Sequence, residues 1–195
     1  MGVIVVRMES QTTTQDLSLY RPNVGVVLFN KAGQVWLGRR AKADGPYNWQ
    51  FPQGGVDEGE ELYDAARREL YEETGVRHAS LLGRTEDWVA YDFPAGWTGA
   101  KAMKGWRGQK QVWFALKFEG EDREVNLNAH GEPEFDAWRW ADIEETIDLV
   151  VPFKRNAYAL VIDAFRRFAN PLAPAPEAGQ KKSKSWLGKL FRDDA

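Results

Sequence analysis

Three glutamates in the segment RELYEETGV, residues 68–76, have the spacing of metal ligands on one side of a helix. Glu69, Glu72 and Glu73 stand at positions i, i+3 and i+4, which are neighbours on a helix surface, and like charges there destabilise a helix by roughly 0.2–0.5 kcal/mol per pair. Three carboxylates that tolerate this repulsion require a concentrated positive charge beside them. Because no His or Cys accompanies them, the oxygen ligands favour Mg²⁺, with Mn²⁺ possible, over zinc. The competing interpretation is a structural network of ion pairs with arginines.

The helix that must position these acids is predicted over residues 60–74, with Gly75 as its C-terminal cap. At about 100° per residue, its apolar residues form one stripe, and the three glutamates lie on that stripe or beside it. The stripe consists of Leu62, Ala65, Ala66 and Leu70. A carboxylate turned toward a core is costly unless a positive partner compensates it, which again favours a cation site.

The approach to this helix, GGVDEGEE, is rich in glycine and is predicted to be a loop. Free backbone N–H groups and the positive end of the helix dipole lie where such a loop meets a helix. An anionic ligand or a tight backbone turn suits this arrangement.

The spacing of these residues resembles the complete Nudix box, G-x5-E-x7-R-E-U-x-E-E-x-G-U, where U is aliphatic. Gly54, Glu60 and the run Arg68 to Val76, including Gly75, fill every fixed position. The resemblance implies a single-domain α/β hydrolase, an α/β/α sandwich with a mixed sheet, that cleaves a nucleoside diphosphate linked to another group. It also implies that Glu69, Glu72 and Glu73 hold metal ions. Arg68 would orient carboxylates, and Glu60 would be a structural partner or a weaker metal contact.

Pyrophosphate hydrolysis suits such a site, because cations neutralise the developing charge and a carboxylate takes the proton of the attacking water. Glu72 and Glu73 are the candidate bases. Glu134, in GEPEFDAWRW, could reach the metal from a strand end, or it could be a surface acid before that strand.

Segments outside the box resemble the bacterial RNA pyrophosphohydrolase branch and relatives that cleave dinucleoside polyphosphates. They are YRPNVG, NWQFPQGG, GQKQVWFAL, PEFDAWRW and VPFKR. The resemblance implies an RNA 5′-pyrophosphohydrolase that converts triphosphate ends to monophosphate ends and so promotes RNA decay. The alternatives are a diadenosine tetra- or pentaphosphate hydrolase, a hydrolase of oxidised nucleoside triphosphates, and a non-catalytic nucleotide or RNA sensor. The last is disfavoured because all three acids are present.

The same resemblance implies the substrate contacts. Arg40 and Phe153 would sandwich a base at the 5′ end of single-stranded RNA, or of a nucleotide polyphosphate, beside Val151. Phosphates or base edges would be contacted by Arg21, Gln109 and Lys154. Two alternatives stay open: Phe153 could be core in its helix, and Arg40 could face solvent. The loop at residues 94–110 is basic and aromatic, which also suits a polyanionic strand.

The composition limits the other possibilities. The chain has 195 residues, a net charge of -3, no cysteine, and two distant histidines, so disulfides and zinc–thiolate sites are excluded and any basic site must be local. No stretch reaches the roughly 18 apolar residues of a membrane span, and no secretory signal is recognisable, so we expect a cytoplasmic protein.

The chain divides into a flexible arm (1–19), one domain (20–170), and a Pro/Ala linker with a basic tail (171–195). Within the domain we expect a hairpin over 24–40, strands in 80–93, 110–118 and 134–143, and a closing helix over 151–169. The tail is expected to be disordered; weak docking on an anionic surface or a partner is the alternative.

Overall fold

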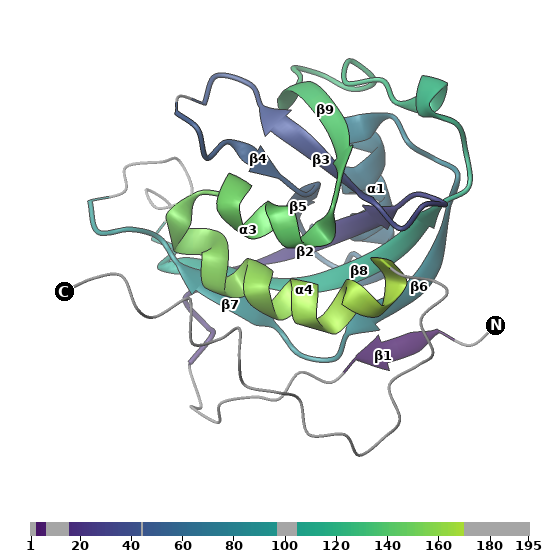
Figure 1. Ribbon diagram of the computed structural model, residues 1–195. Helices are drawn as coiled ribbons and strands as arrows, with labels where there is room; N and C mark the ends of the chain where they lie inside the picture. The colour runs from purple at the N-terminus through teal and green to yellow at the C-terminus, as the bar shows by residue number, and fades with distance from the viewer. Residues whose placement is uncertain (1–2, 7–15, 44, 97–104, 170–195) are drawn as a thin grey trace.

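The computed structural model describes residues 3–6, 16–43, 45–96 and 105–169, and its strands form one mixed sheet (Figure 1). The main path across the sheet is, in order, β1 (Ile4–Val6), β6 (Ala79–Thr85), β8 (Gly108–Phe118), β2 (Tyr20–Phe29), β3 (Val35–Arg40) and β4 (Trp49–Gln50). Three further strands pair off this path: β5 (Gln53–Gly55) with β2, β7 (Val89–Asp92) with β8, and β9 (Phe135–Ala141) with β3.

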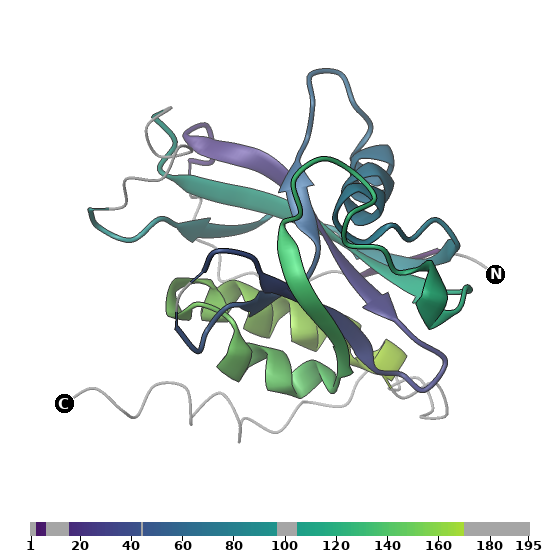
Figure 2. The same cartoon turned by 90° about the horizontal axis from the view of Figure 1, so that it is seen from above.

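Helices cover both faces of this sheet. Seen from above, α1 (Leu62–Thr74) lies on one side, and α3 (Thr146–Leu149) and α4 (Arg155–Ala169) lie on the other (Figure 2). Short 3-10 turns η1 (Asp122–Glu124), η2 (Ile143–Glu145) and η3 (Pro152–Lys154) join the elements. The predicted α/β/α sandwich with a mixed sheet is confirmed.

Strands β2 and β8 form the parallel centre of the sheet, in register from Tyr20 opposite Gly108 to Phe29 opposite Lys117. Side chains alternate between the two faces of a strand, and here both faces are covered. Val26 and Leu28 of β2 therefore enter the apolar core under α1, while Val27 and Phe29 enter the core under α4. This double burial explains why VGVVLF reads as an uninterrupted apolar run.

The hairpin predicted over 24–40 is confirmed as β2 and β3, which pair antiparallel around the turn at Asn30–Gln34. The stretch expected to be strand over 80–93 is divided into β6 and β7. Both pair antiparallel with β8, β6 along its second half and β7 along its first. The break at residues 86–88 lets one chain segment follow β8 along most of its length.

The closing helix begins later than predicted. Pro152 starts the 3-10 turn η3, and α4 itself runs from Arg155 to Ala169. Phe153 and Lys154 consequently belong to η3. Within α4, Val161 and Phe165 are buried, whereas Leu160 is 44% exposed.

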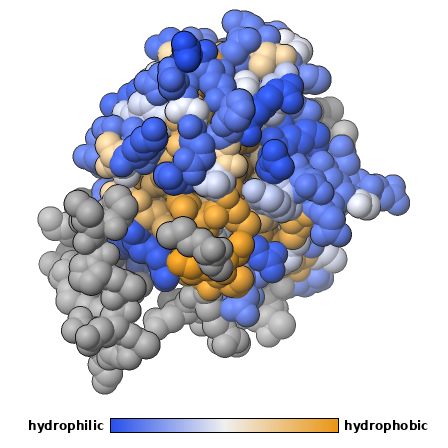
Figure 3. Space-filling view, turned by 90° about the vertical axis from the view of Figure 1, so that its right-hand side faces the viewer, coloured by the Kyte–Doolittle hydropathy of each residue, from blue (hydrophilic) through white to orange (hydrophobic). Residues whose placement is uncertain are grey.

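Strand β1 lies within the segment expected to be a flexible arm. This strand pairs in parallel with β6 at the edge of the sheet. Val3 and Val5 are about half exposed, at 52% and 51%, and apolar atoms gather on this side of the molecule (Figure 3). Most of the arm and the whole predicted tail lie outside the described residues. Among the described helices, none is long and apolar enough to cross a bilayer.

Candidate active site

The helix that carries the three glutamates begins at Leu62, two residues later than predicted, so Glu60 lies in the loop before it. It ends at Thr74, and Gly75 follows in the left-handed conformation with φ 77°, its N–H donating to the carbonyl of Tyr71. Ala65, Ala66 and Leu70 are buried on the sheet, as the apolar stripe requires. Glu73 is buried with them at 6% exposure, and the Glu69 side chain is only 13% exposed. The acids therefore lie beside the core, where their charge is costly.

Arg68, in the middle of this helix, is the centre of a polar network that reaches the preceding loop. Its Nε and Nη2 each donate to one carboxylate oxygen of Glu60 at 2.8 Å, a bidentate pair. Nη2 also donates to the carbonyl oxygen of Gly55 at 2.8 Å. Nη1 donates to Glu69 at 2.8 Å and to Glu72 at 3.4 Å. Arg68 thus orients carboxylates, and Glu60 connects it to the preceding loop by accepting from the backbone N–H of Asp57.

The acids around Arg68 differ in their readiness to ionise. Hydrogen bonds from Arg68 hold the pKa of Glu60 at about 2, against an ordinary value of 4.5. Burial raises the pKa of Glu69, and Arg68 opposes that effect only in part, while the charges of Glu72 and Glu134 add to it. Glu134 itself is exposed just before β9. Its effect on the pKa of Glu69 shows that the two carboxyls are close enough to interact.

Strand β5 approaches the acids through its backbone. The N–H of Gln53 donates to a carboxylate oxygen of Glu73 at 3.0 Å. A Cβ atom added to Gly54 would lie 1.9 Å from the carboxylate of Glu69, and one added to Gly55 would lie 2.1 Å from the Arg21 guanidinium. Neither glycine has a positive φ, so their role is to allow this close contact rather than an unusual backbone conformation.

The carboxylates of this site are candidate ligands for a metal ion. Within the described ranges, no three acidic or histidine side chains are gathered so that they could hold one ion. Glu69 and Glu72 point to Arg68, and Glu73 points to β5. The chemistry nevertheless fits a hard cation: all the donors are carboxylate oxygens, and burial leaves Glu69 in need of positive charge.

Most residues expected to bind substrate surround Tyr91, a buried residue of β7. The Tyr91 hydroxyl donates to the side-chain oxygen of Gln109, which is also buried. The Phe153 ring lies 5.8 Å from the Tyr91 ring, and Lys154 Nζ lies 5.6 Å from it. The charges of Arg40 and Arg21 lower the pKa of Tyr91, although burial raises it more.

Two of these residues are less accessible than expected. Lys154 is 7% exposed, and its Nζ donates to the side-chain oxygen of Gln50 at 3.2 Å. Phe153 is partly buried and packs on the α4 core, as does Val151. The packing interpretation of Phe153 is therefore confirmed, and its role in binding a base stays a prediction.

Three polar residues were not anticipated: Gln50, Gln53 and Tyr91. The two glutamines flank the Phe-Pro pair in WQFPQGG, and that spacing could have suggested them. Tyr91 sits in an alternating strand pattern that carries no chemical signal. In the basic loop, Lys101 and Lys104 lie outside the described residues, and Arg107 forms an ion pair with Asp92 at 2.9 Å.

Comparison with known proteins agrees with this geometry. A family model described as NUDIX domain matches residues 19–161. An "RNA pyrophosphohydrolase" of Caulobacter vibrioides is 59% identical over 163 residues, which is 83% of this chain and 95% of the relative. A protein of the same name from Azorhizobium caulinodans is 48% identical over 168 residues, covering 82% and 99%.

Solved structures resemble the chain in fold. The E. coli dihydroneopterin triphosphate pyrophosphohydrolase has a TM-score of 0.55 and 23% identity, and it covers 74% of this chain and 99% of its own. A C. elegans Ap4A hydrolase binary complex has a TM-score of 0.50 and 20% identity, with 74% and 97% covered.

Proposed function

Because the chain belongs to the Nudix family, we propose that it is an RNA 5′-pyrophosphohydrolase that converts 5′-triphosphate ends to 5′-monophosphate ends and so promotes RNA decay. The observation that carries this proposal is the 59% identity to an RNA pyrophosphohydrolase across 95% of that relative. An RNA substrate also supports the expected cytoplasmic location.

The proposal includes a divalent cation, which Nudix proteins typically use. Glu69, Glu72 and Glu73 would hold it, with Glu134 as a further ligand, and oxygen donors favour Mg²⁺, with Mn²⁺ possible. When bound, the ion would neutralise phosphate charge and orient the attacking water. Arg68 already donates hydrogen bonds to Glu69 and Glu72, so it would hold these carboxylates in place while they also contact the ion.

The protein's own residues would supply the proton transfer. Glu72 and Glu73 are the candidates that take the proton of the attacking water. The carboxylate of Glu73 accepts a hydrogen bond from the backbone N–H of Gln53, which fixes its position beside β5. The Glu72 side chain is 30% exposed and can accept a proton from a solvent-derived water.

The cluster around Tyr91 would bind the substrate. Arg21, Arg40 and Lys154 bring positive charge that suits a polyphosphate, and the Phe153 ring suits a terminal base. Gln109 is fixed by the Tyr91 hydroxyl and would present its amide to a base edge or phosphate. Val151 would line the same cleft.

A direct comparison of substrates tests the proposal. Purified protein with Mg²⁺ is given RNA with a 5′-triphosphate end and, separately, diadenosine tetraphosphate, and kcat/KM is measured for each. We expect RNA to be the better substrate and to acquire a 5′-monophosphate end. A preference for the dinucleotide by orders of magnitude, with intact RNA ends, would show that the alternative hydrolase activity is the correct one.

A further inference from the structure

A hollow of about 390 Å³ lies on the flank of α1 that faces away from the catalytic glutamates. At about 100° per residue, Arg67 and Tyr71 stand 160–200° around the helix from Glu69. The volume falls in the range of about 300–1,000 Å³ that is usual for small-molecule sites. The lining residues are Asp64, Arg67, Arg68, Leu70, Tyr71, Val76, Arg77, Ala79 and Leu116.

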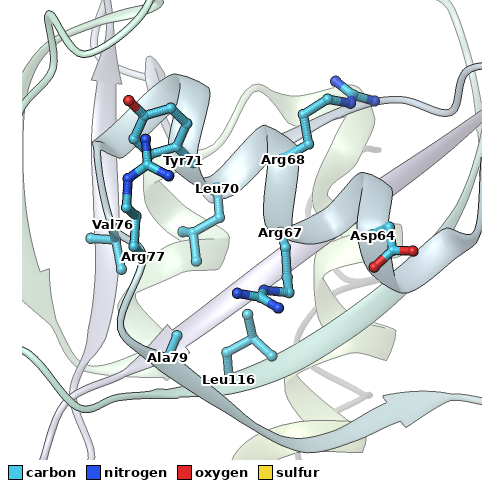
Figure 4. A pocket seen from close by; sticks show the side chains of 9 residues that line it. All are labelled: Asp64, Arg67, Arg68, Leu70, Tyr71, Val76, Arg77, Ala79 and Leu116. Carbon is cyan, nitrogen blue, oxygen red and sulfur yellow. The ribbon is translucent and has the colours of Figure 1, made fainter.

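Two guanidinium groups reach this hollow from different elements. Arg67 projects from α1 toward Leu116, Arg77 comes from the segment after α1, and Arg68 points away from both (Figure 4). Among the described residues, neither the Arg67 nor the Arg77 guanidinium forms an ion pair with a carboxylate, although the backbone N–H of Arg77 donates to Glu124 at 2.6 Å. The Arg77 guanidinium lies 3.6 Å from the centre of the Tyr71 ring, which fixes its plane and leaves its N–H edge as a donor.

The floor of the hollow is apolar. Leu70, Val76 and Leu116 are at most 2% exposed, and Ala79 is half-buried. Asp64 stands at the other end from Arg77 (Figure 4). The hollow thus has a cationic side, an apolar floor and a single acid at its far end.

We propose that this hollow is a second ligand site and that it binds a nucleoside monophosphate. The Arg67 and Arg77 forks match a phosphate dianion, which they can bind by charge-assisted hydrogen bonds. A planar base fits the apolar floor beside the stacked Tyr71 and Arg77 pair. The Asp64 carboxylate accepts from ribose hydroxyls or from an exocyclic amino group. The inference does not depend on the reaction proposed for the glutamate site, since none of these three side chains belongs to it.

Methyl NMR of the full chain can locate the ligand, because Leu70, Val76 and Leu116 report on this hollow and Val151 reports on the catalytic cleft. The protein, without divalent cation, is titrated with AMP. We expect saturating shifts at the three floor residues with a Kd of about 1 mM or tighter. The substitutions Arg67→Ala and Arg77→Ala should each weaken this binding at least about tenfold, whereas Arg167→Ala, an exposed arginine of α4, should not change it. Arg77→Lys should also weaken it, because lysine lacks the planar fork.

Further ligands define the site's chemistry. Inorganic phosphate and adenosine should each bind at least about tenfold more weakly than AMP, since each lacks half of the recognised groups. If a 5′-phosphorylated trinucleotide binds as tightly as AMP, the nucleoside monophosphate recognised by the site can be the 5′ end of an RNA. If the trinucleotide binds more weakly, the ligand is a free nucleotide. Phosphate that binds as tightly as AMP would overturn the nucleotide assignment. AMP that shifts only the methyl signals of Val151 would show that it binds in the catalytic cleft and not in this hollow. Methyl shifts at Leu70, Val76 and Leu116 that persist unchanged in Arg67→Ala and Arg77→Ala would also contradict the proposed site.

Discussion

At the scale of single residues, two carboxyls that contact the same arginine have pKa values shifted in opposite directions, because one of them is buried more deeply. Glu60 receives two hydrogen bonds from Arg68 and ionises readily, whereas burial makes Glu69 reluctant to ionise despite contact with the same guanidinium. Glu60 therefore stabilises the helix start. Burial makes the charge of Glu69 costly, Arg68 offsets that cost in part, and an added cation would offset more of it. The two roles of the helix, holding its own structure and holding a ligand, are thus divided between residues nine positions apart in the chain.

The role of Glu60 predicts a pH-dependent loss of stability in Glu60→Gln. Its folded pKa of about 2 lies below the ordinary 4.5, so its stabilisation is present above pH 4.5 and is lost as pH falls toward 2. We expect the substitution to lower the free energy of unfolding by about 1–3 kcal/mol at pH 7, and the deficit to shrink below pH 4.5. Urea unfolding at several pH values measures this. Glu61→Gln, at an exposed position next in the chain, is the control, and an equal deficit in the two variants would contradict the assignment.

The position of Glu73 predicts a catalytic defect without a folding defect. Glu73→Gln keeps an acceptor for the Gln53 N–H but cannot take a proton. If Glu73 is the base, kcat should fall by roughly 10²–10⁴. Steady-state kinetics measures the loss, and thermal unfolding should show an intact fold. Unchanged turnover would remove Glu73 from the mechanism and leave Glu72 as the candidate.

At the scale of elements, the site depends on how closely β5 approaches α1. Gly54→Ala would place a methyl group 1.9 Å from the Glu69 carboxylate, so either the strand or the carboxylate must move. We expect a loss of about 1–3 kcal/mol in stability and at least about a tenfold drop in kcat/KM. Gly59→Ala is a matched control: it has φ 76° and no atom within 4 Å, so it strains the backbone without touching the site. Activity that falls equally in both variants would mean that loop strain, not the Glu69 contact, is responsible.

Sequence patterns predicted the elements whose signals are local. The acids, the apolar stripe and Gly75 all lie within one helix, and the hairpin around Asn30–Gln34 has its turn residues at hand, so short-range rules sufficed. The start of α4 was misplaced because Pro152 opens a 3-10 turn as readily as a helix. Tyr91 escaped notice for a different reason. Its environment joins β7, β8 and η3, and only the folded chain brings Gln109 and Phe153 to its side.

At the scale of the whole molecule, one segment of the sheet contacts both the core under α4 and the glutamate site on α1. The buried Tyr158 of α4 stacks on Phe51, with ring centres 5.1 Å apart, and its hydroxyl accepts from the Phe51 N–H at 3.0 Å. Two residues later, Gln53 donates to Glu73. One short segment therefore links the helix on one face of the sheet to the carboxylate of Glu73 on the other.

This link predicts that a change in α4 reaches the active site. Tyr158→Phe keeps the ring but leaves the Phe51 N–H buried without its acceptor, which should cost about 1–3 kcal/mol in stability. Because the strain falls on the segment that fixes Glu73, kcat should also fall, by no more than about tenfold. Thermal unfolding and steady-state kinetics measure the two effects. Tyr63→Phe, which removes a hydroxyl from α1 where the ring packs on Phe114, is the control and should change stability by less than about 0.5 kcal/mol. If Tyr158→Phe loses stability at full turnover, the two faces of the sheet are independent, and the position of Glu73 is set by α1 and β5 alone.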